Sequence, residues 1–216
     1  GGLGTFDGPF TVQWGATLRP ATGSLLSLLG DLTNYGTLKP TTTTAGSFSF
    51  EGQNLVNDGQ AEDVSVLVKG PGPHFLSGSG TWTGLGRLRV DVTTLQLASD
   101  VTYEAAILDL SGGGCLDLGA HTLDLPDGGT LLSLPLGTEI AGSGKITASG
   151  GGVIRNDGVI TPTLQVLGQG VSAAGVGPFA GPLLVDAGAT LTVTQFSNLL
   201  ATGNVTVTGT LGPGSY

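Results

Sequence analysis

The sequence predicts an all-β fold, a parallel β-helix or closely related β-solenoid in which short strands stack coil on coil. Apolar and polar residues alternate with a period of two in many short runs, such as Val64–Val68 and Leu88–Val92. Glycine, asparagine, aspartate or proline bounds each run, as expected for strands that end in tight turns. No longer window shows a helical apolar period free of glycine and proline, so almost no α-helix is expected.

A degenerate repeat indicates the length of one coil. Segments 46–59 and 144–158 each read as glycine, a short β-prone run, glycine, two adjacent apolar residues and then Asn-Asp-Gly. The related segments 78–83 and 142–147 begin 64 positions apart, which is three coils of about 21 residues. A chain of 216 residues then holds nine or ten coils. Two shorter spacings agree, because Leu18 and Leu38, and likewise Asn34 and Asn57, stand one such interval apart.

The domain organisation predicted is one β-solenoid spanning 1–216, because no shift in composition marks a second domain. Segment 168–182, rich in glycine, alanine and proline, breaks the alternation and is the candidate for a protruding loop. The chain starts with Gly-Gly and contains no methionine, so we expect a fragment or a processed part of a longer chain.

Composition restricts the function classes. A net charge of −9 with only seven lysines and arginines argues against nucleic-acid binding, which needs a basic surface. No apolar run approaches the length of a membrane-spanning helix, and the single Cys115 excludes a disulfide framework and a cysteine metal site. We therefore expect no cofactor. A charged fraction of 11%, with abundant glycine, threonine and serine, favours an extracellular or cell-surface location.

Three segments carry a resemblance to a known group of proteins: 116–125, 188–193 and 203–211. Their pattern resembles the degenerate repeats of right-handed parallel β-helix surface proteins, which include autotransporter passenger domains and filamentous-haemagglutinin-like adhesins. The resemblance is good over 78–216 and looser over 1–77. It implies a right-handed coil and a secreted or surface-displayed bacterial protein, but no particular ligand.

Aromatic residues are the candidate contacts for a carbohydrate, because flat rings stack on sugar rings. The candidates are Trp82, Trp14 and Tyr35. For Trp82 there is a competing interpretation, since it occupies the position that Ile146 holds in the related copy of the repeat. That parallel favours packing in the core.

Asparagines and glycines at the ends of the repeats are predicted to be structural turn residues rather than a functional site. Asparagine followed by x-Gly is typical turn chemistry, either in a left-handed conformation or stacked as an internal amide ladder. These turn positions are Asn34, Asn57, Asn156, Gly59 and Gly158.

Three copies of Leu-Asp-Leu place carboxylates at Asp109, Asp117 and Asp124. Lined up, they could hold a cation or act as catalytic acids. Their spacings of eight and seven positions are shorter than a coil, however. We therefore expect them on successive faces of one coil, as solvated outward positions between inward leucines.

The function expected is a non-enzymatic extracellular or cell-surface structural module, such as an adhesin stalk or a self-assembling filament subunit. Its expected partners are further copies, stacked end to end, and a glycan or other surface ligand. Two alternatives remain open at this point. One is a polysaccharide-active β-helix enzyme, and the other is a non-catalytic carbohydrate-binding module.

Overall fold

The protein is a parallel β-solenoid, as the alternation and spacing predict. A computed structural model describes residues 3–21, 24–40, 47–104, 107–110, 112–126, 131–195 and 197–213. Every regular element within these ranges is a β-strand, and no helix occurs among them. It follows that none of the described residues forms a helix that could cross a membrane.

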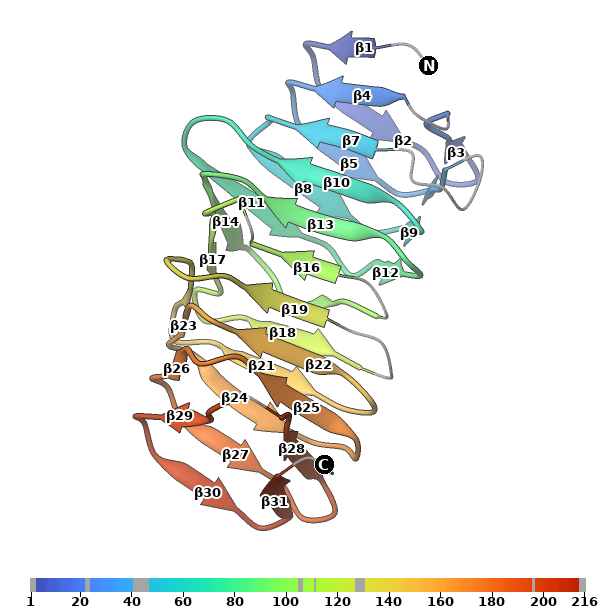
Figure 1. The fold of residues 1–216 in the computed structure, drawn as a ribbon. Coiled ribbons are helices and arrows are strands. Elements are labelled where there is room, and N and C mark those ends of the chain that lie inside the picture. Colours follow the sequence, from blue (N-terminus) through green and yellow to red (C-terminus); the bar gives the residue numbers. More distant parts are fainter. Residues whose placement is uncertain are drawn as a thin grey trace.

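The strands form three faces, so that one coil contributes one strand to each face (Figure 1). Sheets A and B run along two faces for almost the full length, while the third face is divided between sheet C in the N-terminal part and sheet D in the C-terminal part. Sheet A consists of β1 (Leu3–Phe6), β4 (Leu25–Leu28), β7 (Ser47–Phe50), β10 (Ser65–Val68), β13 (Arg87–Val90), β16 (Ile107–Asp109), β19 (Leu131–Leu134), β22 (Val153–Asn156), β25 (Val171–Ala174), β28 (Thr190–Val193) and β31 (Thr210–Pro213).

The other sheets follow the same order along the chain. Sheet B consists of β2 (Phe10–Val12), β5 (Leu32–Asn34), β8 (Asn54–Asn57), β11 (Pro73–Ser77), β14 (Thr94–Leu97), β17 (Cys115–Asp117), β20 (Glu139–Ala141), β23 (Val159–Ile160), β26 (Pro178–Phe179) and β29 (Leu200–Ala201). Sheet C consists of β3 (Thr17–Leu18), β6 (Thr37–Leu38), β9 (Gln60–Glu62) and β12 (Thr81–Thr83). Sheet D consists of β15 (Val101–Thr102), β18 (Thr122–Leu125), β21 (Lys145–Ala148), β24 (Thr163–Val166), β27 (Leu183–Val185) and β30 (Val205–Val207).

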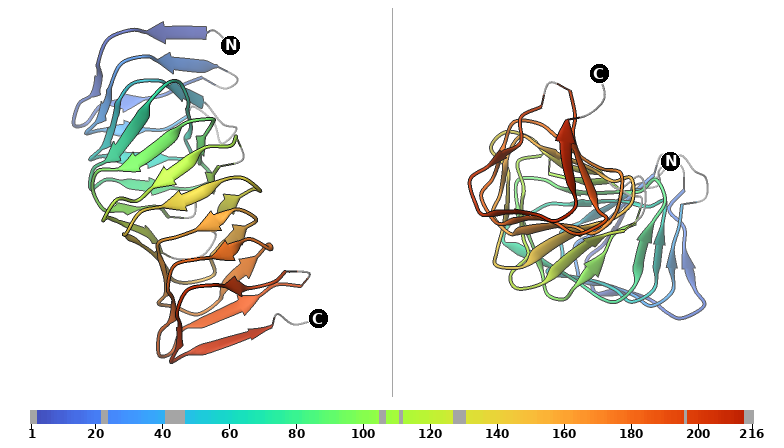
Figure 2. Two further views of the ribbon diagram at one scale, coloured as in Figure 1. Left: turned by 90° about the vertical axis from the view of Figure 1, so that its left-hand side faces the viewer. Right: turned by 90° about the horizontal axis from the view of Figure 1, so that it is seen from below.

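Pairing registers give the coil length directly. Along sheet A, paired residues are 22 positions apart between β1 and β4, 18 between β7 and β10, and 24 between β16 and β19. These steps bracket the coil length predicted from the repeat. In Figure 1 the strands of sheet A from β1 to β22 run leftward at the front, and the chain returns rightward behind them while descending from the N-terminus. This path is a right-handed coil. Figure 2 shows the coils from the side and from below, where they enclose a common interior.

The interior is filled by columns of apolar side chains, one from each coil. On sheet A, Phe48, Val66, Leu88 and Leu108 pair in register and are at most 2% exposed. Burying one such side chain fully contributes about 1.5–3 kcal/mol relative to leaving it in water. A strand of three or four residues supplies only one or two inward side chains. Stability therefore comes from stacking successive coils, as in other solenoids.

Segment 168–182 is not a protruding loop, so that prediction is wrong. It contains β25 and β26, which pair with their neighbours in sheets A and B, and Val171 and Phe179 face the core. The residues that broke the alternation make a short coil instead, in which Val153 pairs with Ser172, 19 positions later. Small side chains and the left-handed Gly175, with φ of 97°, allow the tight corner.

Carboxylates at the corners bind the backbone of the next coil, which accounts for part of the acidic excess. Each accepts a hydrogen bond of 2.8–3.1 Å from a main-chain N–H that lies about one coil later in the sequence. At a corner, such an N–H leaves the regular ladder and needs another acceptor. The residues concerned are Asp31, Asp58, Asp63, Asp100 and Asp157.

Candidate functional site

The candidate site is a groove along the corner where the chain passes from sheet B to sheet C. Its floor is a column of glycines, Gly36, Gly59 and Gly80, one from each of three successive coils. A Cβ atom on Gly59 would lie 2.1 Å from the carbonyl oxygen of Gly36, and one on Gly80 would lie 2.2 Å from that of Gly59. Only glycine permits this stacking distance, and no side chain rises from the floor.

Buried asparagines hold the corner from inside. Asn34 and Asn57, the last residues of β5 and β8, are at most 1% exposed. Asn34 Nδ2 donates to Asn57 Oδ1 at 2.7 Å and to the Gln60 carbonyl at 3.1 Å, and Asn57 Nδ2 donates to the Thr81 carbonyl at 3.2 Å. Neither residue has a positive φ. They form an amide ladder between coils rather than left-handed turns, and this ladder holds the successive coils of the groove together.

Asn156 and Gly158 occupy the equivalent corner in the C-terminal part. Asn156 is fully buried and its Nδ2 donates to the carbonyls of Gly177 at 3.0 Å and Pro178 at 3.2 Å. A Cβ atom on Gly158 would lie 2.3 Å from the Thr138 carbonyl oxygen. This corner has the same buried asparagine and closely stacked glycine as the N-terminal groove, but it lacks the Trp14–Tyr35 pair.

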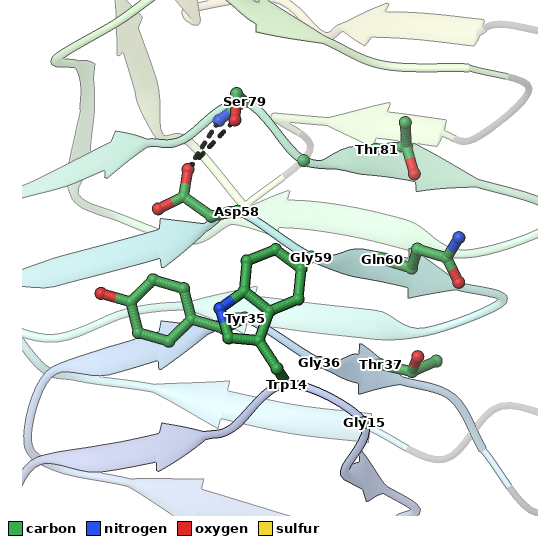
Figure 3. A pocket seen from close by; sticks show the side chains of 11 residues that line it. Trp14, Gly15, Tyr35, Gly36, Thr37, Asp58, Gly59, Gln60, Ser79 and Thr81 are labelled. Atoms are coloured by element: carbon green, nitrogen blue, oxygen red, sulfur yellow. Dashed lines mark hydrogen bonds between the residues drawn. The ribbon is translucent and has the colours of Figure 1, made fainter.

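Trp14 and Tyr35, two of the predicted carbohydrate contacts, lie together at the groove (Figure 3). Their rings stack, with centroids 6.0 Å apart and an angle of 25° between the planes. The Trp14 side chain is 74% exposed, although tryptophan is usually well buried. One side of the indole contacts Tyr35, and the rest of its surface is open to solvent.

Polar side chains form two walls beside these rings. Figure 3 shows Thr37, Gln60 and Thr81 in a column on one side, with Asp58 and Ser79 across the corner from them. Asp58 Oδ1 accepts hydrogen bonds from the backbone N–H of Ser79 at 3.0 Å and from its hydroxyl at 3.3 Å. The walls and floor enclose an open pocket of about 400 Å³.

A second open pocket, of about 480 Å³, continues the groove towards the C-terminus. Ser79 lines both pockets, and Asp100 and His121 lie further along the second. His121 Nδ1 is 3.7 Å from Asp100 Oδ1, and that oxygen also accepts the backbone N–H of Thr122 at 2.8 Å. The groove therefore follows the solenoid axis across several coils.

Trp82, the third predicted carbohydrate contact, is not available at the surface. Its side chain is 3% exposed and packs inside the solenoid against Tyr103, at a centroid distance of 5.8 Å. An isolated bridge between these two residues joins the end of sheet C to the start of sheet D. The prediction that Trp82 contacts a carbohydrate is therefore wrong, because its ring points into the solenoid and cannot reach a ligand outside.

The three Leu-Asp-Leu carboxylates lie on separate faces of one coil, on β16, β17 and β18. Asp109 differs from the expected solvated position, because it is 4% exposed and pairs with Arg87 at 3.0 Å. Asp124 accepts a hydrogen bond from the Thr147 hydroxyl. Within the described ranges, no three histidine, cysteine, aspartate or glutamate side chains gather as a metal site would require.

Sequence reasoning missed the polar walls of the groove. Asp58 lies one coil length after Tyr35 in the sequence, and Ser79 lies one coil length after Asp58, so the coil spacing itself was the signal that could have found them. Applied to the corner positions rather than to the strands, the same spacing aligns Trp14, Tyr35, Asp58 and Ser79 in one column.

Comparison with known proteins adds no further assignment. No protein-family model matches this sequence, and neither curated proteins nor solved structures give a significant match.

Proposed function

We propose that this protein is a non-enzymatic structural module of an extracellular or cell-surface protein, a stiff β-solenoid that extends by stacking onto further coils. Both roles expected from the sequence, an adhesin stalk and a filament subunit, use this one property. The extracellular or surface location is supported by the low charged fraction of 11% and by the resemblance to β-helix surface proteins.

The observation that carries the proposal is the exposed interior of the terminal coils. On β30, Val205 and Val207 are 47% and 41% exposed, whereas Leu183 and Val185, their register partners one coil earlier, are 0% and 1% exposed. At the other end Phe6 is 45% exposed, while its partner Leu28 is 1% exposed. Inward side chains that every internal coil covers are thus open to water at both ends of the described stack.

Covering such a coil would be favourable for two reasons. Another coil of the same kind would remove its apolar side chains from water. It would also pair the N–H and C=O groups of the open strand edge, which otherwise form a template for further pairing. Few charges oppose the approach, since β30 contains only valine and threonine.

Static light scattering across a range from micromolar to millimolar concentration tests the proposal. We expect concentration-dependent association, with rods joined end to end in negative-stain micrographs. The double variant V205K/V207K places two charges on the open edge and should abolish association. L136K is the matched control, because Leu136 is 88% exposed in a turn on the side of the solenoid.

A monodisperse monomer at the highest concentration would contradict the proposal. So would association that V205K/V207K and L136K affect equally, since the contact would then lie elsewhere than at the open coil.

A further inference from the structure

We propose that the corner groove beginning at Trp14 binds an extended, neutral saccharide chain that lies along the solenoid axis. The groove lies on the side of the solenoid, and none of its lining residues belongs to β1 or β30, the end strands whose exposed side chains support coil stacking. Trp14 itself follows β2 in the first coil.

The first argument comes from the exposed indole. Trp14 lies outside the apolar core, and its ring is held by stacking on Tyr35. Large rigid rings with little conformational freedom are well suited to contact ligands, and their faces are apolar. The apolar C–H face of a pyranose ring is complementary to such a surface, whereas the hydroxyl groups at its rim need polar partners.

The groove walls provide those partners. Asp58 Oδ1 accepts hydrogen bonds from Ser79, but no described residue donates to Oδ2, which leaves it available to accept a hydrogen bond from a saccharide hydroxyl. Gln60 and Thr81 are exposed on the opposite wall. An amide and a hydroxyl both donate and accept, as a saccharide hydroxyl does. The site thus combines an apolar platform with polar groups that converge on it.

The charge of the groove selects among saccharides. Asp58 is the charged residue among those that line the first pocket, and no lysine or arginine lines it. Anionic ligands such as uronates, sulfated glycans and phosphates require basic partners. They would also meet repulsion from Asp58, and they are therefore disfavoured. A simple cation could be attracted to the indole and to Asp58. The open floor and the walls along three coils fit a long chain better.

The spacing of the walls sets the direction of the ligand. Stacked parallel strands lie about 4.8 Å apart, so each coil offers one polar position per wall at that interval. A pyranose residue in an extended glycan takes up a similar length. Because the second pocket continues from Ser79 to Asp100 and His121, longer chains gain additional contacts. We expect hexasaccharides to bind more tightly than the corresponding disaccharides.

Isothermal titration calorimetry with neutral hexasaccharides, namely cellohexaose, xylohexaose, maltohexaose and laminarihexaose, tests the proposal. Intrinsic fluorescence gives a second readout, because Trp14 is the exposed one of the two tryptophans. At least one of these saccharides should bind saturably, shift the emission to shorter wavelength and shield the indole from acrylamide. Its disaccharide should bind more weakly.

Variants then locate the binding site. W14A should weaken binding at least about tenfold, equivalent to about 1.4 kcal/mol. D58N, which keeps the oxygen that caps Ser79 but removes the charge, should weaken it less. L136A removes another highly exposed apolar side chain, which lies outside the groove, and should leave affinity unchanged. Circular dichroism of each variant establishes that the solenoid is intact.

Three results would overturn the proposal. The first is the absence of saturable binding by every neutral hexasaccharide. The second is equal affinity of W14A and L136A for a saccharide that does bind. The third is preferential binding of polygalacturonate or choline, which would assign the groove to an anionic or a cationic ligand.

Discussion

Two tryptophan–tyrosine pairs in this protein are alike in sequence spacing and similar in geometry, yet they lie on opposite sides of the solenoid wall. In Trp14–Tyr35 and in Trp82–Tyr103 the two residues are separated by the same interval, one coil. Their ring centroids are 6.0 and 5.8 Å apart, at interplanar angles of 25° and 32°. Trp14 is 74% exposed, however, and Trp82 is 3% exposed. The same kind of ring contact therefore fills the interior in one pair and orients an exposed ring in the other.

The backbone position explains the difference. Trp82 is the central residue of β12, where strand alternation directs its side chain to the interior. Trp14 follows β2 in a turn that is completed by the left-handed Gly15, with φ of 76°. In a strand, the alternation of side chains determines whether a ring is buried. In a turn, the local backbone conformation determines the direction of the side chain, so an aromatic residue can face solvent without disturbing the stacked coils.

The largest expected effect follows from truncating the inner pair. Trp82→Ala would leave a cavity where sheets C and D meet, and replacing a buried tryptophan by alanine typically costs about 3–5 kcal/mol. The free energy of unfolding, measured with urea, should fall by an amount in this range. A loss below about 1 kcal/mol would mean that Trp82 does not close the wall at this junction.

An intermediate effect is expected at Tyr103. Burial raises the pKa of its hydroxyl far above the usual value, and a hydrogen bond with the Leu88 backbone acts in the opposite direction. In the unfolded chain the hydroxyl ionises near pH 10. Above that pH the unfolded state loses a proton that the folded state retains, so stability should decrease as pH rises.

Tyr103→Phe tests this pH dependence. At neutral pH it removes a hydrogen bond and should cost about 1 kcal/mol. Above about pH 10 the phenylalanine variant avoids the ionisation penalty, so the difference from the wild type should shrink. Urea unfolding of both proteins at neutral pH and above about pH 10 measures this difference in stability. A difference that stays constant with pH would show that Tyr103 ionises as easily in the folded state as in the unfolded one.

The two pairs also show how far sequence reasoning reaches. Trp82 could be assigned to the core because it aligns with Ile146, which is also buried. The coil length, the parallel strands and the inward columns followed from alternation and spacing in the same way. These properties recur in every coil, so one sequence contains several copies of the pattern that predicts them.

Features that depend on one location could not be predicted in this way. Alternation places Asp109 on the outer face, but Arg87 covers it in the folded protein. Alternation also fails in 168–182, where glycine and alanine hide two regular strands. The coil spacing aligns Trp14 with Tyr35, but it does not indicate that the Trp14 ring lies outside the wall, above a glycine floor. That arrangement depends on the turn geometry of two consecutive coils.

The smallest expected change in stability is that of Trp14→Ala. Most of the indole is already in water, so its removal forfeits mainly the stacking on Tyr35, and we expect a loss of about 0.5 kcal/mol in urea unfolding. A loss as large as that of Trp82→Ala would mean that the outer pair supports the fold, and it would remove the reason for assigning this ring to a ligand. A small loss of stability combined with impaired saccharide binding would assign different roles to the two pairs. The buried pair would stabilise the fold, and the exposed pair would bind the ligand.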